Sequence, residues 1–371
     1  MRFQNLPLSP MGKNLSNTKK NLNDAFRKLE LDKQVQWLEP LQYDMNSTFS
    51  KEREKVGNYL NATDFNESTH GPPILLIFLP SKNQREFNRQ AFKSFASSYN
   101  FASQCVENWE SASSSTSPWA AKELAISIYV KAGSQWKILP NLADSGTYFI
   151  AFDVSSIDNV SRPAVYLVSS NGTVFKHGEP SPPQKGETIK GIGQMIKDTI
   201  QDAVEIEGGE PMRHLVISRD GRFQLEERTS IEELAQTHEL NISMVEVTKS
   251  GPMVYRMIKL DDEGKAQGPD SGLWWKLDQN TANLCTTGSP GGNNIVPARG
   301  LSQPIAVTKV GGRLDDTSLD QIVEWMFSLS RLTAYSDKPT RLPIHLHLAD
   351  RSAKDYIDQI KYPNRRGIHA A

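Results

Sequence analysis

The stretch TYFIAFDVS, residues 147–155, is a short apolar run that ends in a single acid. Its consecutive apolar residues, 148–152, predict a buried β-strand, because a short continuous run of this kind suits a strand covered on both faces. An ionised carboxylate without a partner is costly to bury. Asp153 therefore either meets a cation where the strand leaves the core, or lies where the strand has already reached the surface.

A second strand with a terminal acid follows in MRHLVISRDGRF, residues 212–223, where Asp220 precedes a turn. In an α/β sheet functional groups gather at strand ends, so two such acids from adjacent strands would face one another. Like charges at short range need a cation, and Mg²⁺ or Mn²⁺ takes oxygen ligands of this kind. Each aspartate could instead cap a turn or a helix. The pair favours the cation site without deciding between the two readings.

The region before this strand, residues 71–140, alternates strands and helices. Strands are predicted within 71–80, 101–109 and 135–139, and helices at 83–100 and 118–133. The second helix has Pro at its start and Gly at its end. The alternation predicts a small parallel α/β domain.

Residues 1–70 are polar and rich in Asn and Lys, and we interpret them as a leader or linker region. Leu22, Phe26 and Leu29 follow helical spacing, which predicts a short amphipathic helix there.

The residues after 140 form a second α/β unit. Further strands are predicted within 163–175, 242–251 and 301–312, with helices at 188–206, 229–240, 319–334 and within 341–360. Ser-Asn-Gly at 170–172 is a hairpin signal. Thr229 or Ser230 is predicted to cap the helix at 229–240.

Composition sets the broad class of protein. A length of 371 residues favours about two domains. The net charge of −1 gives no global argument for nucleic-acid binding, so any basic patch is local. Cys105 and Cys285 form neither a metal-ligand spacing nor a disulfide framework, which fits a reduced, cytoplasmic compartment. The apolar run at 74–79 is too short to span a membrane.

Six segments occur in the order of a PIWI domain: FIAFDVS, GETIKGIGQMI, HLVISRDGRF, VEVTKSG, ARGLSQPIAVTKVGG and KPTRLPIHLHLADRSAK. From about residue 71 onward the chain resembles the C-terminal half of a prokaryotic Argonaute. The resemblance implies an α/β protein, with a Rossmann-like MID domain at 71–140 that binds the 5′ end of a guide. An RNase H-like PIWI domain at 141–371 would then cut a target strand paired to that guide.

The family's active site consists of Asp, Glu, Asp and then Asp, His or Asn. Asp153 matches the first position, Glu187 the mobile glutamate, Asp220 the next aspartate and Asp350 the last. Glu179 is a rival for the glutamate but lacks the following helix. The resemblance implies two Mg²⁺ or Mn²⁺ ions beside the scissile phosphate. Asp153 would bridge both ions, Asp220 and Asp350 would each hold one, and Glu187 would complete the site and orient water.

His345 and His347, in PIHLHLAD, have a spacing that would place both on one face of a strand. Direct metal ligation is one reading. We favour packing or groove residues near Asp350.

The resemblance also implies a pocket for the guide 5′ phosphate, formed by Arg89, Lys93, Gln104 and Lys131. Arg89 and Lys93 lie four apart on one helix face. Arginine would act as a fork donor and lysine as a point charge. Alone, those two residues would equally suit a solvated helix face. In the family a further metal ion can join this pocket to the chain's C-terminal carboxylate.

About 70 residues before MID are too few for the N and PAZ domains of long Argonautes. Short Argonautes of this layout usually lack the catalytic acids, whereas this sequence has all four. Three hypotheses follow. The first is a guide-directed endonuclease. The second is a non-cleaving module that binds guide and target and acts with a separate N/PAZ-containing or effector protein. The third is a less specific RNase H-like nuclease. Guide and target are DNA or RNA, and no membrane is implied.

Overall fold

The computed structural model describes most of the chain. The described residues are 10–31, 49–62, 74–78, 102–106, 118–131, 142–157, 160–176, 184–185, 188–207, 212–256, 258–260, 262–264, 266–287, 303–313, 317–332 and 340–361.

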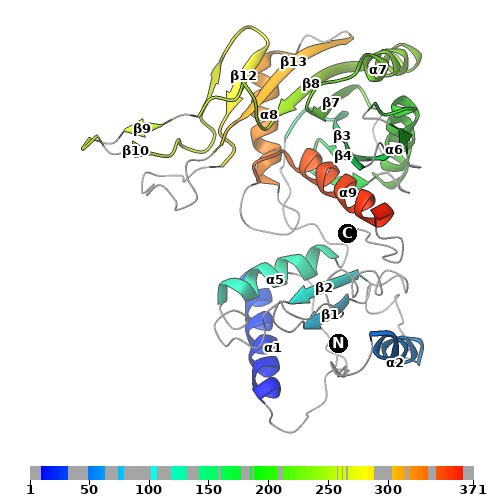
Figure 1. Ribbon diagram of the computed structural model, residues 1–371. Coiled ribbons are helices and arrows are strands. Elements are labelled where there is room, and N and C mark those ends of the chain that lie inside the picture. Colours follow the sequence, from blue (N-terminus) through cyan, green and yellow to red (C-terminus); the bar gives the residue numbers. More distant parts are fainter. Residues whose placement is uncertain are drawn as a thin grey trace. The chain divides into compact units, whose positions relative to one another are not determined.

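The chain folds into two compact units (Figure 1). The first unit comprises Met1–Trp136, Ala334–Asp337 and Tyr362–Ala371. The second comprises Lys137–Thr333 and Lys338–Lys361.

The described elements of the first unit are α1 (Pro10–Lys28), α2 (Phe49–Ala62), β1 (Ile74–Phe78), β2 (Ala102–Val106) and α5 (Pro118–Lys131). β1 and β2 pair in parallel, as the strand–helix–strand pattern predicts. Proline begins α5, where its missing N–H costs nothing. The predicted helix at 83–100 and strand at 135–139 lie outside the described residues.

Helix α1 belongs to the core of the first unit. Leu22 and Phe26 are buried in one apolar cluster with Ala121 and Ala125 of α5. The amphipathic helix expected from Leu22, Phe26 and Leu29 is thus confirmed. Residues 10–31 are more than a lead-in, because their apolar stripe is covered by α5.

The second unit is built on a nine-stranded mixed sheet with the order β11-β12-β13-β8-β7-β3-β4-β5, and β6 pairs with β4. Its strands are β3 (Thr147–Ile157), β4 (Val160–Ser169), β5 (Val174–Lys176), β6 (Gln184–Lys185), β7 (His214–Asp220), β8 (Asn241–Thr248), β11 (Trp274–Lys276), β12 (Thr281–Leu284) and β13 (Ile305–Arg313). The central strands β3, β7 and β8 run parallel, and the flanking pairs are antiparallel. β9 (Lys259–Leu260) and β10 (Ala266–Gln267) form a separate hairpin.

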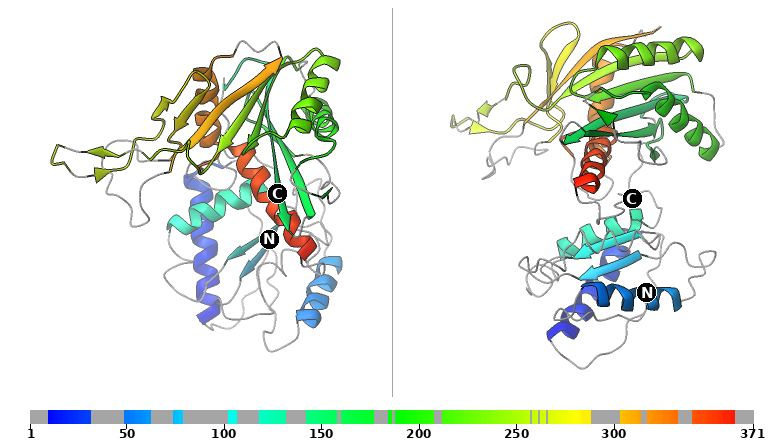
Figure 2. Two further views of the ribbon diagram at one scale, coloured as in Figure 1. Left: turned by 45° about the horizontal axis from the view of Figure 1, so that its top comes forward. Right: turned by 45° about the vertical axis from the view of Figure 1, so that its right-hand side comes forward.

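Both faces of the central sheet are covered, which explains the unbroken apolar run in β3. Ile150 and Phe152 belong to one core with residues of α6 (Ile192–Glu207) and α7 (Leu225–Thr237). Phe149 points the other way and meets Trp325 of α8 (Leu319–Arg331) edge-on at 5.4 Å. Figure 2 shows the helices on the two sides of the sheet. The α/β class expected from the sequence is therefore confirmed, with a mixed sheet.

The predicted hairpin at Ser-Asn-Gly joins β4 to β5. The Ser169 N–H donates to the Thr173 carbonyl at 2.9 Å, and Gly172 has φ 89°. A positive φ is accessible to glycine at little cost, which is why this turn contains one.

The predicted start of α7 is wrong. The helix begins at Leu225, with Gln224 at the N-cap, and not near Thr229 or Ser230. The Thr229 hydroxyl donates to the Leu225 carbonyl within the helix at 3.1 Å. Leu225 is exposed, and Glu227 is buried in the first turn. Because of this first turn, the apolar periodicity of the sequence places the N-terminus of α7 too late in the chain.

Among the helices that the structure describes, none has the length and apolar character needed to cross a lipid bilayer.

Candidate metal centre

Asp153 and Asp220 lie where the parallel ladder of the sheet ends. β3 pairs with β7 up to Phe152 opposite Arg219, so Asp153 is the first residue of β3 beyond that ladder. The strand itself continues to Ile157 against β4. Asp220 is the last residue of β7, and its position faces Val247 of β8. The two acids therefore come from adjacent strands at one edge, as their local sequences predict.

Asp350 reaches the same edge from a helix. Helix α9 (Ile344–Lys361) packs across β3 and β4. The Tyr166 hydroxyl on β4 lies 2.8 Å from the Ser352 hydroxyl on α9. This contact fixes the helix turn that carries Asp350.

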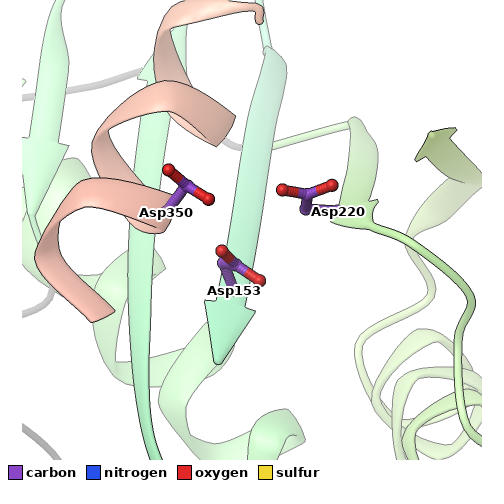
Figure 3. A group of neighbouring side chains, drawn as sticks. All are labelled: Asp153, Asp220 and Asp350. Carbon is purple, nitrogen blue, oxygen red and sulfur yellow. The ribbon is translucent and has the colours of Figure 1, made fainter. Parts of the chain in front are cut away.

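The three carboxylates converge (Figure 3). One oxygen from each of Asp153, Asp220 and Asp350 lies within 4.8 Å of the other two. Three carboxylate oxygens this close could hold a metal ion, and hard divalent ions such as Mg²⁺ and Mn²⁺ suit such ligands.

The electrostatics of the cluster call for positive charge. Burial, reinforced by the neighbouring charges of Asp220 and Asp350, raises the pKa of Asp153 from 3.8 to about 7. The Val154 N–H donates to Asp153 Oδ1 at 2.8 Å and opposes part of this rise. A cation at the cluster would favour the ionised form of Asp153.

A lysine that the sequence reasoning missed supplies one positive charge. Lys249 directly follows β8, and its ammonium contacts Asp220 Oδ2 and lies 2.9 Å from Asp350 Oδ1. Burial lowers the pKa of Lys249, but its hydrogen bonds to the two aspartates outweigh this and leave the pKa raised. The feature of the sequence that could have indicated Lys249 is its position directly after the next parallel strand, at the sheet edge where Asp220 lies.

The main chain at Lys249 is held by Arg341. The Arg341 guanidinium donates to the carbonyl of Lys249, to the carbonyl of Pro304 at 2.9 Å and to Gln303 Oε1 at 3.0 Å. The Thr286 hydroxyl in turn donates to the Arg341 carbonyl at 2.6 Å. Lys249 is thus fixed at its backbone while its side chain extends to the aspartates.

Glu227 ties together the segments that flank the cluster. This fully buried carboxylate lies 2.9 Å from Arg219 Nε, next to Asp220 in the chain. It also accepts the N–H of Gln224 at 2.9 Å and the N–H of Ile189 at 3.1 Å. One side chain therefore joins the end of β7, the start of α7 and the segment that leads into α6.

Glu246 holds the turn after Asp220 from the other side. Its Oε1 accepts the Phe223 N–H at 3.0 Å and pairs with Arg228 at 3.0 Å. Gly221, with φ 91°, donates to the Val247 carbonyl at 2.9 Å. Hydrogen bonds to two residues of β8 therefore hold the turn that directly follows Asp220.

Two solved structures with the same fold are Argonautes. Clostridium butyricum Argonaute, bound to a guide DNA with a 5′ deoxycytidine and a 19-mer target DNA, superposes with a TM-score of 0.72 at 21% identity. It covers 93% of this chain and 46% of its own. Kluyveromyces polysporus Argonaute with a guide RNA gives a TM-score of 0.70 at 12% identity, over 96% of this chain and 46% of its own. The chain has the Argonaute fold. It spans about half the length of these two proteins.

The Argonaute likeness rests on structure, because neither a protein-family model nor a curated protein sequence matches the chain. The order of motifs in the sequence and the superposition point to the same fold.

Only some of the other predicted site residues lie in the part of the chain that the structure describes. Glu187 and its rival Glu179 lie outside the described residues, as do Arg89 and Lys93. Gln104 is half-buried on β2, opposite Leu76 of β1. Lys131 is the last residue of α5. The guide-phosphate pocket therefore stays a prediction.

The histidines are not on a strand, contrary to the sequence expectation. Both lie at the start of α9, and Pro343 explains the boundary, since proline is well tolerated at helix starts. His345 is fully buried, with Nε2 3.2 Å from the Ser218 hydroxyl, and burial lowers its pKa to about 3. It packs beneath β7 and is not part of the aspartate cluster. His347 is half-buried in the same helix.

Proposed function

We propose that the chain is a guide-directed endonuclease. It binds the 5′ phosphate of a short nucleic-acid guide and hydrolyses one phosphodiester bond of a complementary target strand. The observation that carries this proposal is the convergence of Asp153, Asp220 and Asp350 within 4.8 Å in a chain with the Argonaute fold. The fold alone would suit a protein that only binds nucleic acid, whereas the cluster adds ligands for divalent ions.

The aspartates fit the ions that such chemistry needs. Their oxygen atoms suit Mg²⁺ or Mn²⁺. The raised pKa of Asp153 reflects its burial first, and then the negative charges of Asp220 and Asp350. Two divalent ions here would activate a water molecule for attack and stabilise the leaving 3′ oxygen. Asp153, from the central strand, would contact both ions, while Asp220 and Asp350 would each contact one. Glu187 is proposed to complete the set and orient the water.

The first unit is proposed to hold the guide. We assign residues 71–140 as the MID domain and 141–371 as the PIWI domain, and the change of unit at Trp136/Lys137 supports this division. The proposed ligands of the guide 5′ phosphate are Arg89, Lys93, Gln104 and Lys131. One further divalent ion could bind at this phosphate. The two similar Argonautes hold a guide DNA and a guide RNA respectively, so both guide types are candidates.

A cleavage assay tests the proposal. Purified protein is mixed with a 5′-phosphorylated DNA or RNA guide, a labelled complementary strand, and Mg²⁺ or Mn²⁺. We expect one cut at a fixed phosphate, abolished by EDTA and by Asp220→Asn. The matched control is Asp320→Asn, which removes the same charge from an ion pair with Lys276 on the surface of the second unit. Cutting without a guide would point instead to a less specific nuclease.

A second candidate is a binding module that does not cut and works with a partner protein. The observation in its favour is Lys249, whose ammonium already engages two of the three acids. Nucleic acid of guide length that copurifies with the protein, combined with no cut product for any guide or metal, would favour this candidate.

A further inference from the structure

Lys249 brings a positive charge to two of the three carboxylates of the aspartate cluster. The ammonium contacts Asp220 and Asp350, and the side chains of these residues are 10% and 17% exposed. Hydrogen bonds between charged groups are among the strongest that side chains make, so this contact contributes to holding the acids together. A lysine in this position uses the same carboxylate oxygens that would coordinate an ion.

The backbone and the side chain of Lys249 are held by different contacts. Arg341 fixes the Lys249 carbonyl, as described above. The Lys249 side chain is 32% exposed and carries a flexible four-carbon stem. The ammonium can therefore leave the cluster for solvent by rotation of the side chain, while the main chain stays in place.

We propose that Lys249 competes with divalent ions for the aspartate cluster: its ammonium closes the cluster in the metal-free protein and must leave before an ion binds. This inference rests on the proposed metal site and adds to it a residue that sets metal affinity. The physical reason is simple. An ammonium and a metal ion that approach the same pair of oxygens, Asp220 Oδ2 and Asp350 Oδ1, compete for that position and repel one another.

The proposal predicts that removal of the ammonium tightens metal binding. Lys249→Met keeps most of the stem but not the charge. In the chelated and then dialysed protein, its Mn²⁺ affinity by isothermal titration calorimetry should rise about tenfold, the equivalent of losing one competing contact of ~1.4 kcal/mol. The Mn²⁺-dependent rise in melting temperature should grow accordingly. Lys276→Met is the matched control, because Lys276 pairs with Asp320 outside the cluster, and its Mn²⁺ affinity should equal that of the wild type.

A second variant and a measurement on the wild type protect the test against misfolding. Lys249→Gln removes the charge but keeps a hydrogen-bond donor, and it should also bind Mn²⁺ more tightly. In the wild type, pulse acetylation read by mass spectrometry should modify Lys249 faster with Mg²⁺ than with EDTA. Lys276 serves as the internal reference. Unchanged or weaker Mn²⁺ affinity in both variants, or acetylation of Lys249 that ignores Mg²⁺, would overturn the proposal.

Asp220→Asn separates this inference from the proposed function. If Asp220→Asn binds Mn²⁺ as well as the wild type does, the metal centre itself is wrong. If Asp220→Asn loses Mn²⁺ binding while Lys249→Met binds as the wild type does, the metal centre stands and only the competition is wrong.

Discussion

Arg219 Nε lies 2.9 Å from Glu227 Oε2, and both side chains are buried. Arg219 immediately precedes Asp220, so this ion pair fixes the residue next to a proposed metal ligand. The same carboxylate accepts the N–H of Ile189, two residues after Glu187 in the chain. Glu227 therefore connects the two segments that carry two of the proposed catalytic acids.

Glu227→Gln should destabilise the second unit by about 3 kcal/mol, because breaking a buried ion pair leaves Arg219 without a counter-charge. Urea unfolding followed by tryptophan fluorescence measures the change. Glu226→Gln is the control, since Glu226 is the exposed neighbour on the same helix, and its stability should stay within about 0.5 kcal/mol of the wild type. Equal stability of the two variants would show that the pair is not structurally important.

The sequence predicted the parts of the site that depend on local pattern. Asp153 and Asp220 each follow an apolar strand, and the strand pattern was enough to place them at one sheet edge. Asp350 was different. It lies on a helix 130 positions after Asp220, so no local pattern joins it to the others, and only the resemblance to Argonautes indicated it.

The residues that the sequence did not indicate are those whose role depends on tertiary contacts. A prediction from sequence alone puts charged residues such as Lys249 and Glu227 on the surface, because charges are rarely buried unless paired. The partners of Lys249 lie 29 or more positions away in the chain. Those of Glu227 include a backbone N–H 38 positions away. Such pairing cannot be read from periodicity, which reports only which face of an element is apolar.

Gly221→Ala tests the turn after Asp220. Gly221 has φ 91°, a conformation that costs an L-residue about 1–2 kcal/mol. Stability should fall by that amount, and guided cleavage should fall with it, because Asp220 is the adjacent residue. Gly268→Ala is the control: its φ is ordinary, and an added methyl group would meet open space. A Gly221→Ala protein with wild-type stability and cleavage would contradict the assignment of strain to this turn.

Arg341→Met tests the anchor of the Lys249 main chain. The variant leaves the carbonyls of Lys249 and Pro304 without their guanidinium donor, which should cost about 1–3 kcal/mol of stability. Thermal unfolding with and without Mn²⁺ measures it. Arg213→Met is a suitable control because Arg213 is an exposed residue of the same unit. If both variants melt at the wild-type temperature, the contacts of Arg341 do not stabilise this edge of the sheet.

The pH dependence of stability tests the charge balance of the cluster. Burial and the neighbouring aspartates raise the pKa of Asp153 from 3.8 to about 7 in the absence of metal. The folded state thus holds this proton more tightly than the unfolded state does. Its contribution to stability is complete below about pH 4 and is lost as the pH rises through about 7. In EDTA, wild-type stability should therefore fall over this range relative to Asp153→Asn, which has no proton to lose. Parallel curves of urea midpoint against pH would contradict the raised pKa.

Metal binding should reverse this dependence. A divalent ion favours the ionised carboxylate, so Mn²⁺ binding at about pH 6 must expel the proton that Asp153 holds there. Calorimetric titration in two buffers of different ionisation enthalpy counts the protons released. We expect the wild type and Asp320→Asn, the surface control, each to release nearly one proton on metal binding at about pH 6. This release should shrink as the pH rises well above 7, because Asp153 is then already ionised before the metal arrives. A wild-type protein that binds Mn²⁺ at about pH 6 without releasing a proton would show that Asp153 does not ionise when the metal binds.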